Sequence, residues 1–175
     1  NAKVNYVKLR AGWSKVGGTG RLDEYSTNKT FNLANNNFGT QSSVPNTQWN
    51  PNIKPEQTIG TEFGVDVNAY NNRVRLAATY YSQKSSDLIL ALQVEAASGF
   101  TSSWENAGEM TNKGIELQLG LTPIKTDNFS FDIDLNFAKN RNEVTSLSGA
   151  DSYTLGDQWG MQLQAIPGQA YGAIV

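Results

Sequence analysis

The chain has 175 residues, the length of one domain with a core of its own. Its 14 Lys and Arg face 16 Asp and Glu, and a net charge of −2 gives no attraction for nucleic acid. Cysteine and histidine are absent, which excludes thiol chemistry, histidine acid–base catalysis and the usual zinc ligand sets. We therefore expect no metal, no cofactor and no nucleic-acid partner.

The main pattern in the sequence is an alternation of apolar and polar residues with a period of two, which is typical of β-strands with one apolar and one polar face. No comparable helical stripe appears. In chain order, the predicted strands lie near residues 3–15, 58–70, 73–84, 112–122 and 128–144, and a candidate sixth strand lies at 169–175.

Two short connections support this alternation. Asn71-Asn72 is predicted to form a two-residue hairpin turn, because Asn tolerates the positive φ that a type I′ turn requires. Closing that hairpin puts the apolar residues of both strands on one side of the sheet, and a slip of one residue would reverse them. The other short connection lies near Lys125.

The shared apolar face is expected to contact lipid. Its predicted members are Phe63, Val65, Val67, Leu76, Ala78, Leu117, Leu119, Phe131, Ile133 and Leu135.

The lengths of the strands and connections favour a membrane barrel over a soluble sheet. Roughly nine to eleven residues per strand suffice to cross a bilayer at a tilt. Short connections alternate with long polar ones, expected at 14–58, 82–112 and 145–165, as in outer-membrane barrels. We therefore predict an all-β fold of antiparallel up-and-down strands that form part of a large transmembrane β-barrel. A secreted β-sandwich that binds glycans remains the alternative, because it shows the same alternation.

The number of predicted strands is too small for a closed barrel. Single-chain barrels of bacterial outer membranes begin at about eight strands, and an open sheet in lipid leaves edge groups without partners. We expect residues 1–175 to be five or six strands of a larger barrel.

Several sequence blocks, in order along nearly the whole chain, resemble the SusC/RagA-type TonB-dependent transporters. The blocks are WNPNIKPEQT (49–58), EFG (62–64), TYY (79–81), DLIL (87–90), SGF (98–100), NAGEM (106–110), NKGIEL (112–117), NFAKNRNEV (136–144) and PGQAYG (167–172).

This resemblance implies a barrel of about 22 strands around a plug domain. It implies import of oligosaccharides or peptides across the cell outer membrane of Bacteroidetes-type bacteria. The implied partners are a SusD-like surface lipoprotein and the TonB complex, which acts through a plug region that is not expected within residues 1–175.

Two pairs of carboxylates lie on the polar face: Glu62 with Asp66, and Asp132 with Asp134. Residues two apart on a strand share a face, and the spacing by itself is compatible with a carboxylate-based glycosidase. Because carboxylates beside Arg73 and Arg75 more often form ion pairs, we expect no enzymatic activity and assign no catalytic residue.

Trp49, Trp104 and Trp159 fall in the expected long connections. Indole rings stack on sugar rings and are also common at protein interfaces. These three residues are therefore predicted to contact the substrate or the lipoprotein.

Overall fold

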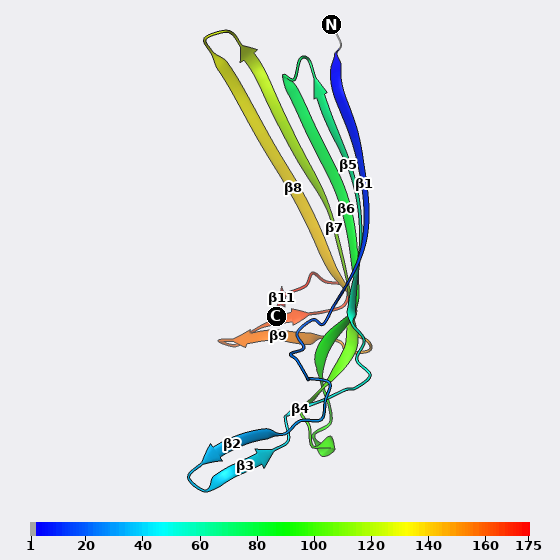
Figure 1. Cartoon of the computed structure of the whole chain (residues 1–175), viewed down its shortest axis with the longest axis vertical. Coiled ribbons are helices and arrows are strands. Elements are labelled where there is room, and N and C mark those ends of the chain that lie inside the picture. Colours follow the sequence, from blue (N-terminus) through cyan, green and yellow to red (C-terminus); the bar gives the residue numbers. More distant parts are fainter. Residues whose placement is uncertain (1–2) are drawn as a thin grey trace. The chain divides into compact units, whose positions relative to one another are not determined.

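The computed structural model describes residues 3–175, and almost all of its regular structure is β-strand (Figure 1). The all-β, antiparallel fold class predicted from the sequence is confirmed. The elements are β1 (Val4–Gly18), β2 (Asn32–Asn36), β3 (Gly39–Ser43), β4 (Thr47–Gln48), β5 (Glu56–Ala69), β6 (Val74–Gln93), the 3₁₀ turn η1 (Ala96–Ser98), β7 (Ser102–Lys125), β8 (Ser130–Ser146), β9 (Tyr153–Gln158), β10 (Met161–Ala165) and β11 (Ala173–Ile174). The described residues contain no helix with the length and apolar character needed to cross a membrane.

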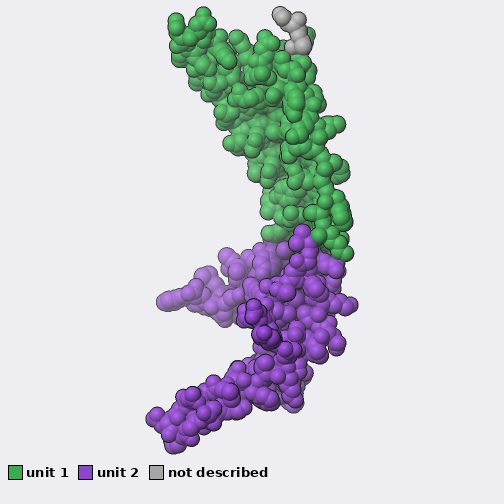
Figure 2. All heavy atoms as spheres, in the orientation of Figure 1, with its two compact units in different colours: residues 1–15, 58–84, 111–143 green, residues 16–57, 85–110, 144–175 purple. Residues whose placement is uncertain are grey.

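The chain divides into two compact units (Figure 2). Unit 1 contains residues 1–15, 58–84 and 111–143, and unit 2 contains residues 16–57, 85–110 and 144–175. Unit 1 holds parts of five strands in the sheet order β1-β5-β6-β7-β8.

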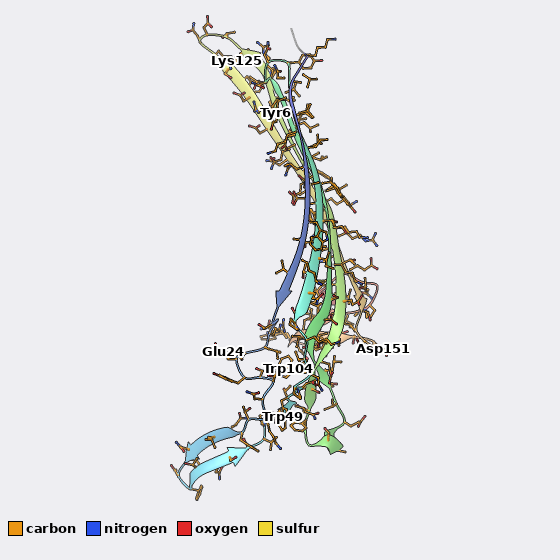
Figure 3. All side chains as sticks on the ribbon, turned by 45° about the vertical axis from the view of Figure 1, so that its right-hand side comes forward. Tyr6, Glu24, Trp49, Trp104, Lys125 and Asp151 are labelled. Atoms are coloured by element: carbon orange, nitrogen blue, oxygen red, sulfur yellow. The ribbon has the colours of Figure 1, made fainter. Side chains whose placement is uncertain are left out.

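Two pairs of neighbouring strands in unit 1, β5 with β6 and β7 with β8, are each joined by a short turn. The backbone N–H of Thr122, near the end of β7, donates to the carbonyl of Arg73, just before β6, at 2.7 Å. The β5–β6 and β7–β8 turns therefore lie at the same end, as the alternating connection lengths predicted, and Tyr6 and Lys125 lie toward that end (Figures 1 and 3). Within the described residues this sheet is open, with β1 and β8 at its edges.

The turn between β5 and β6 is wider than predicted. Asn71 and Asn72 have φ angles of 58° and 62°, as expected for a left-handed turn, and Tyr70 also has a positive φ of 51°. Four residues, 70–73, separate the two strands instead of two. The side-chain oxygen of Asn5 accepts the Asn71 N–H at 2.8 Å, which ties the turn to β1.

All the buried apolar residues of the described chain lie in unit 2. They are Ile89, Ala107, Val144, Leu147 and Ala165, each 2–3% exposed. Three of them, Val144, Leu147 and Ala165, form a small core with Leu90, Ala150, Tyr153 and Leu155 packed around it. Unit 1 is a single-layer sheet that buries no large apolar side chain.

Unit 2 also contains two smaller sheets. One is the β2–β3 hairpin, and the other has the order β11-β10-β9. A turn at Pro167-Gly168, with Gly168 at φ 81°, brings the backbone of Gly168 and Gln169 into hydrogen bonds with Val144 at 2.8 and 2.9 Å. Pro followed by Gly at these positions is typical of a type II turn.

Two expectations about the connections are wrong. The long polar loop predicted at 82–112 is mostly strand, because β6 continues to Gln93 and β7 begins at Ser102. In the candidate strand at 169–175, only Ala173 and Ile174 pair as a strand, with Gln164 and Leu163 of β10. Neither segment has the clean alternation that marks the strands of unit 1.

The positive φ angles at the β5–β6 turn predict a specific sensitivity to side-chain shape. Asn72→Val is expected to lower the free energy of unfolding by about 1–2 kcal/mol, because a β-branched residue is strained in the left-handed region. Asn72→Gly removes that strain and serves as the matched control. Urea unfolding of the full-length protein in lipid vesicles measures both, and equal stability of the two variants would contradict the assignment.

Candidate functional site

Arg10, Arg75 and the acidic residues with which they pair share one face of the unit 1 sheet. Contacts between strands establish this directly: Arg10 of β1 reaches Glu62 and Asp66 of β5, and also Thr79 of β6. We call this surface the polar face. It carries two clusters, each centred on an arginine.

The first cluster is built around Arg10. Its Nη2 atom donates to Asp66 Oδ1 at 3.2 Å and to Thr79 Oγ1 at 3.0 Å. Its Nε atom lies 3.2 Å from Asp66 Oδ2, and its Nη1 atom lies 3.5 Å from Glu62 Oε1. One guanidinium therefore links three neighbouring strands and contacts both carboxylates of the pair Glu62 and Asp66.

The second cluster is built around Arg75. Its Nη1 donates to the hydroxyl of Thr122 and its Nη2 to Asp134 Oδ1, both at 3.3 Å. The Thr122 hydroxyl in turn donates to Asp132 at 2.5 Å, and Ser130 donates to the same carboxylate at 2.8 Å. The second carboxylate pair is thus also held by hydrogen bonds and an ion pair.

Glycines on adjacent strands make room for these large side chains. A Cβ atom at Gly64 would lie 2.8 Å from the Arg10 guanidinium, and a Cβ at Gly120 would lie 2.7 Å from Nη2 of Arg75. At Gly114 the added atom would collide with the Tyr81 ring. Glycine in a strand often marks such a close approach. The long side chains can therefore lie along the sheet instead of standing away from it.

The opposite face of unit 1 is apolar and uncovered. All ten residues predicted to face lipid are exposed or half-exposed, and Phe63 and Leu135 reach 59% and 54%. Among the described residues, no buried apolar core lies against them. A contiguous apolar surface of this kind is unusual on a soluble monomer and marks an interaction surface.

The three tryptophans differ in their surroundings. Trp49 follows β4, packs edge-on against Phe100 with ring centroids 5.6 Å apart, and has the Lys29 Nζ 5.4 Å from its ring centroid. Trp104 lies on β7, so its expected placement in a long loop is wrong. Trp159 occupies the turn of the β9–β10 hairpin with φ 58° and is 93% exposed. Trp49 and Trp104, both labelled in Figure 3, belong to unit 2.

The segment around Trp49 is held by residues that were not predicted from the sequence. Asn106 of β7 accepts the Lys54 N–H and donates to the carbonyls of Lys54 and Asp87, each at 2.8 Å. Asn50 donates to the Trp104 carbonyl at 3.0 Å, and Glu56 accepts the Ile89 N–H at 2.8 Å. These contacts join residues 19–54 positions apart, and no local pattern reveals them.

The arginine clusters predict a ranking of stabilities. Arg10→Leu is expected to lower the free energy of unfolding by about 1–2 kcal/mol. Arg10 ties three strands together, and its removal leaves the half-buried Asp66 without a partner. Arg75→Leu should cost under about 1 kcal/mol, since its pair with Asp134 is more exposed. Arg141, 82% exposed and 3.8 Å from Glu143, is the control. Urea unfolding in vesicles tests this, and an Arg141→Leu effect as large as that of Arg10→Leu would refute the ranking.

Comparison with known proteins also indicates a β-barrel. Residues 3–173 match the family described as TonB dependent receptor-like, beta-barrel. TonB-dependent receptor P26 of Formosa agariphila is 32% identical over 148 residues, which cover 83% of this chain and 15% of that protein. TonB-dependent receptor SusC of Bacteroides thetaiotaomicron is 28% identical over 154 residues, again 83% of this chain and 15% of that protein.

A solved structure described as the RagAB peptide transporter matches with a TM-score of 0.79 over 96% of this chain and 18% of that one. At 24% identity this match supports a similar fold and nothing further. The chain spans about 15% of the length of the curated relatives it matches. By its family match over nearly all residues, the chain belongs to the TonB-dependent receptor-like β-barrel family.

Proposed function

We propose that this chain forms part of the barrel wall of a TonB-dependent outer-membrane importer of oligosaccharides or peptides. The observation that carries the proposal is the single-layer sheet of unit 1, which has an ion-paired polar face and an uncovered apolar face. Such a sheet has no core of its own and needs a different environment on each side. Lipid suits the apolar face, and a water-containing lumen suits the polar one.

An outer-membrane location follows from the family. We propose that the ten apolar residues named above, from Phe63 on β5 to Leu135 on β8, face lipid. The polar face, with the Arg10 and Arg75 clusters, faces the lumen.

The partners of the whole protein are part of the same proposal. They are a SusD-like surface lipoprotein, the TonB complex acting through a plug region, and the transported oligosaccharide or peptide. The proposal includes no nucleic acid and no enzymatic activity, which fits a family of receptors and transporters.

The two alternatives receive less support. A secreted β-sandwich needs a second sheet packed on the apolar face, and the described residues of unit 1 supply none. A glycosidase needs one ionised carboxylate and one carboxyl group that stays protonated so that it can act as the acid. Here Asp66 and Asp134 are paired with arginines, and Asp132 accepts two hydroxyl hydrogen bonds.

The proposed lipid face predicts the effect of a buried charge. Leu119→Lys is expected to destabilise the barrel in lipid by about 2–4 kcal/mol if the residue lies near the bilayer midplane. Gln118→Lys, one residue away on the polar face, is the matched control and should cost little. Folding titrations of the full-length protein into vesicles measure the loss of stability of both variants. Equal losses would show that the two faces do not differ in their contact with lipid.

The proposed partner predicts where contacts fall in the assembled complex. Residues around Trp49, Trp104 and Trp159 should crosslink to the lipoprotein or to bound substrate, because all three belong to unit 2 and none lies at the short turns of unit 1. Trp159 is the strongest candidate, since its indole is almost fully exposed. Asn71 and Lys125, at the short turns, should crosslink to neither. A crosslinking map with contacts concentrated at the short turns would reverse the proposed orientation.

A further inference from the structure

The apolar face of unit 1 gives way to charged residues at the border away from the short turns. On β8, alternate residues from Phe131 to Phe137 are apolar, and the next three on the same face are Lys139, Arg141 and Glu143. On β7, the neighbouring strand, Ile115 is apolar and Lys113 follows it toward the same border. Two adjacent strands therefore change from apolar to charged at one edge of the apolar face.

This change lies at the depth where lipid headgroups begin. Phe129, beside the short β7–β8 turn, and Phe137 are eight positions apart. A strand tilted by about 40° rises roughly 20 Å over that length, close to the apolar band of about 25 Å in outer-membrane barrels. Short turns are periplasmic in such barrels. On the proposed function, the charged border therefore meets the headgroups of the outer leaflet.

A hollow of about 280 Å³ lies at this border, between β7 and β8. It is lined by Thr111 and Lys113 of β7 and by Arg141 and Glu143 of β8, all within unit 1. Lys139 lies two residues before Arg141 and so shares its face. We call these five residues the border cluster.

The border cluster has more positive than negative charge. Its one carboxylate, Glu143, lies 3.8 Å from Nη2 of Arg141, whose side chain is 82% exposed. Lys113 and Lys139 are exposed as well, and neither forms a hydrogen bond or ion pair with its side chain among residues 3–175. Three cations against one carboxylate leave a net charge of +2.

This arrangement favours a bound anion. Lys113 and Arg141 come from neighbouring strands and line one hollow, and like charges on adjacent strands repel each other. An anion between them removes that repulsion. A guanidinium donates to two phosphate oxygens at once, and an ammonium supplies a point charge beside it. The Thr111 hydroxyl adds an uncharged donor.

The surroundings of the hollow favour a lipid over a free anion. Ile115 and Phe137, on the apolar side of the border, are 45% and 56% exposed. We infer that the border cluster binds the phosphate group of an outer-leaflet lipid through Lys113 and Arg141, while the acyl chains of that lipid cover the apolar residues. The inference rests on the proposed function, because it requires the apolar face to lie in the membrane.

The test measures binding of diphosphorylated lipid A to the full-length transporter in dodecyl maltoside, a detergent without phosphate, by native mass spectrometry. Lys113→Gln and Arg141→Gln are each expected to weaken binding about tenfold, the effect of one lost charge-assisted hydrogen bond. Dephosphorylated lipid A, which keeps the acyl chains, should bind at least about tenfold more weakly for the same reason. Inorganic phosphate at the same concentration should not displace the lipid.

Two further variants control for charge and folding. Lys125→Gln removes one positive charge at the short-turn end and should leave binding unchanged. Glu143→Gln removes the negative charge of the border cluster and should strengthen binding, a gain that misfolding cannot produce. Unchanged binding in the Lys113 and Arg141 variants, an equal loss in Lys125→Gln, weaker binding in Glu143→Gln, or displacement by inorganic phosphate would overturn the inference.

A second measurement separates failure of this inference from failure of the proposed function. The photo-crosslinker p-azidophenylalanine at Leu117, on the apolar face, should yield lipid adducts in outer-membrane vesicles. Lipid capture at Leu117 without phosphate-dependent binding of lipid A would reject the border cluster as a lipid site and leave the barrel intact. Absence of lipid capture at Leu117 would reject the proposed face assignment, and the inference with it.

Discussion

Everything in unit 1 depends on the register of a single-layer antiparallel sheet. Side chains alternate between the two faces, so one register puts the Arg10 and Arg75 clusters on one side and the apolar residues from Phe63 to Leu135 on the other. The described part of unit 1 has no apolar core that could stabilise a sheet with the wrong register, because all the buried apolar residues among the described ones lie in unit 2. A slip of one residue would place Arg10 and Arg75 on the apolar face and Phe131 on the polar face.

Glycine links this register to the shape of the polar face. Gly64 and Gly120 lie beside Arg10 and Arg75, and each leaves the space that a guanidinium occupies. The arginines can then lie along the sheet and reach carboxylates on neighbouring strands. The two glycines therefore leave room for the guanidinium groups. They limit how far the arginine side chains project from the sheet.

Unit 2 is stabilised by different means. Its small core around Val144 and Leu147 is apolar, and its segment at residues 46–57 is held by side-chain amides that replace missing backbone partners. Asn106 serves two segments at once, because it bonds both Lys54 and Asp87. This arrangement fixes Trp49 against Phe100, whereas Trp159 stays exposed on its hairpin turn.

Local sequence patterns were enough to specify the strand-rich fold, the two faces of unit 1 and the left-handed turn at Asn71, because period-two alternation and local φ preferences are properties of neighbouring residues. Ordered blocks along the chain also indicated the family. The folded chain was needed to show that β6 and β7 extend through an expected loop, that Trp104 lies on a strand, and that Arg10 meets Asp66 over Gly64. The first two features rest on pairing of β6 with β7 in a stretch without clean alternation, and the third joins residues 56 positions apart, whose pairing no local pattern specifies.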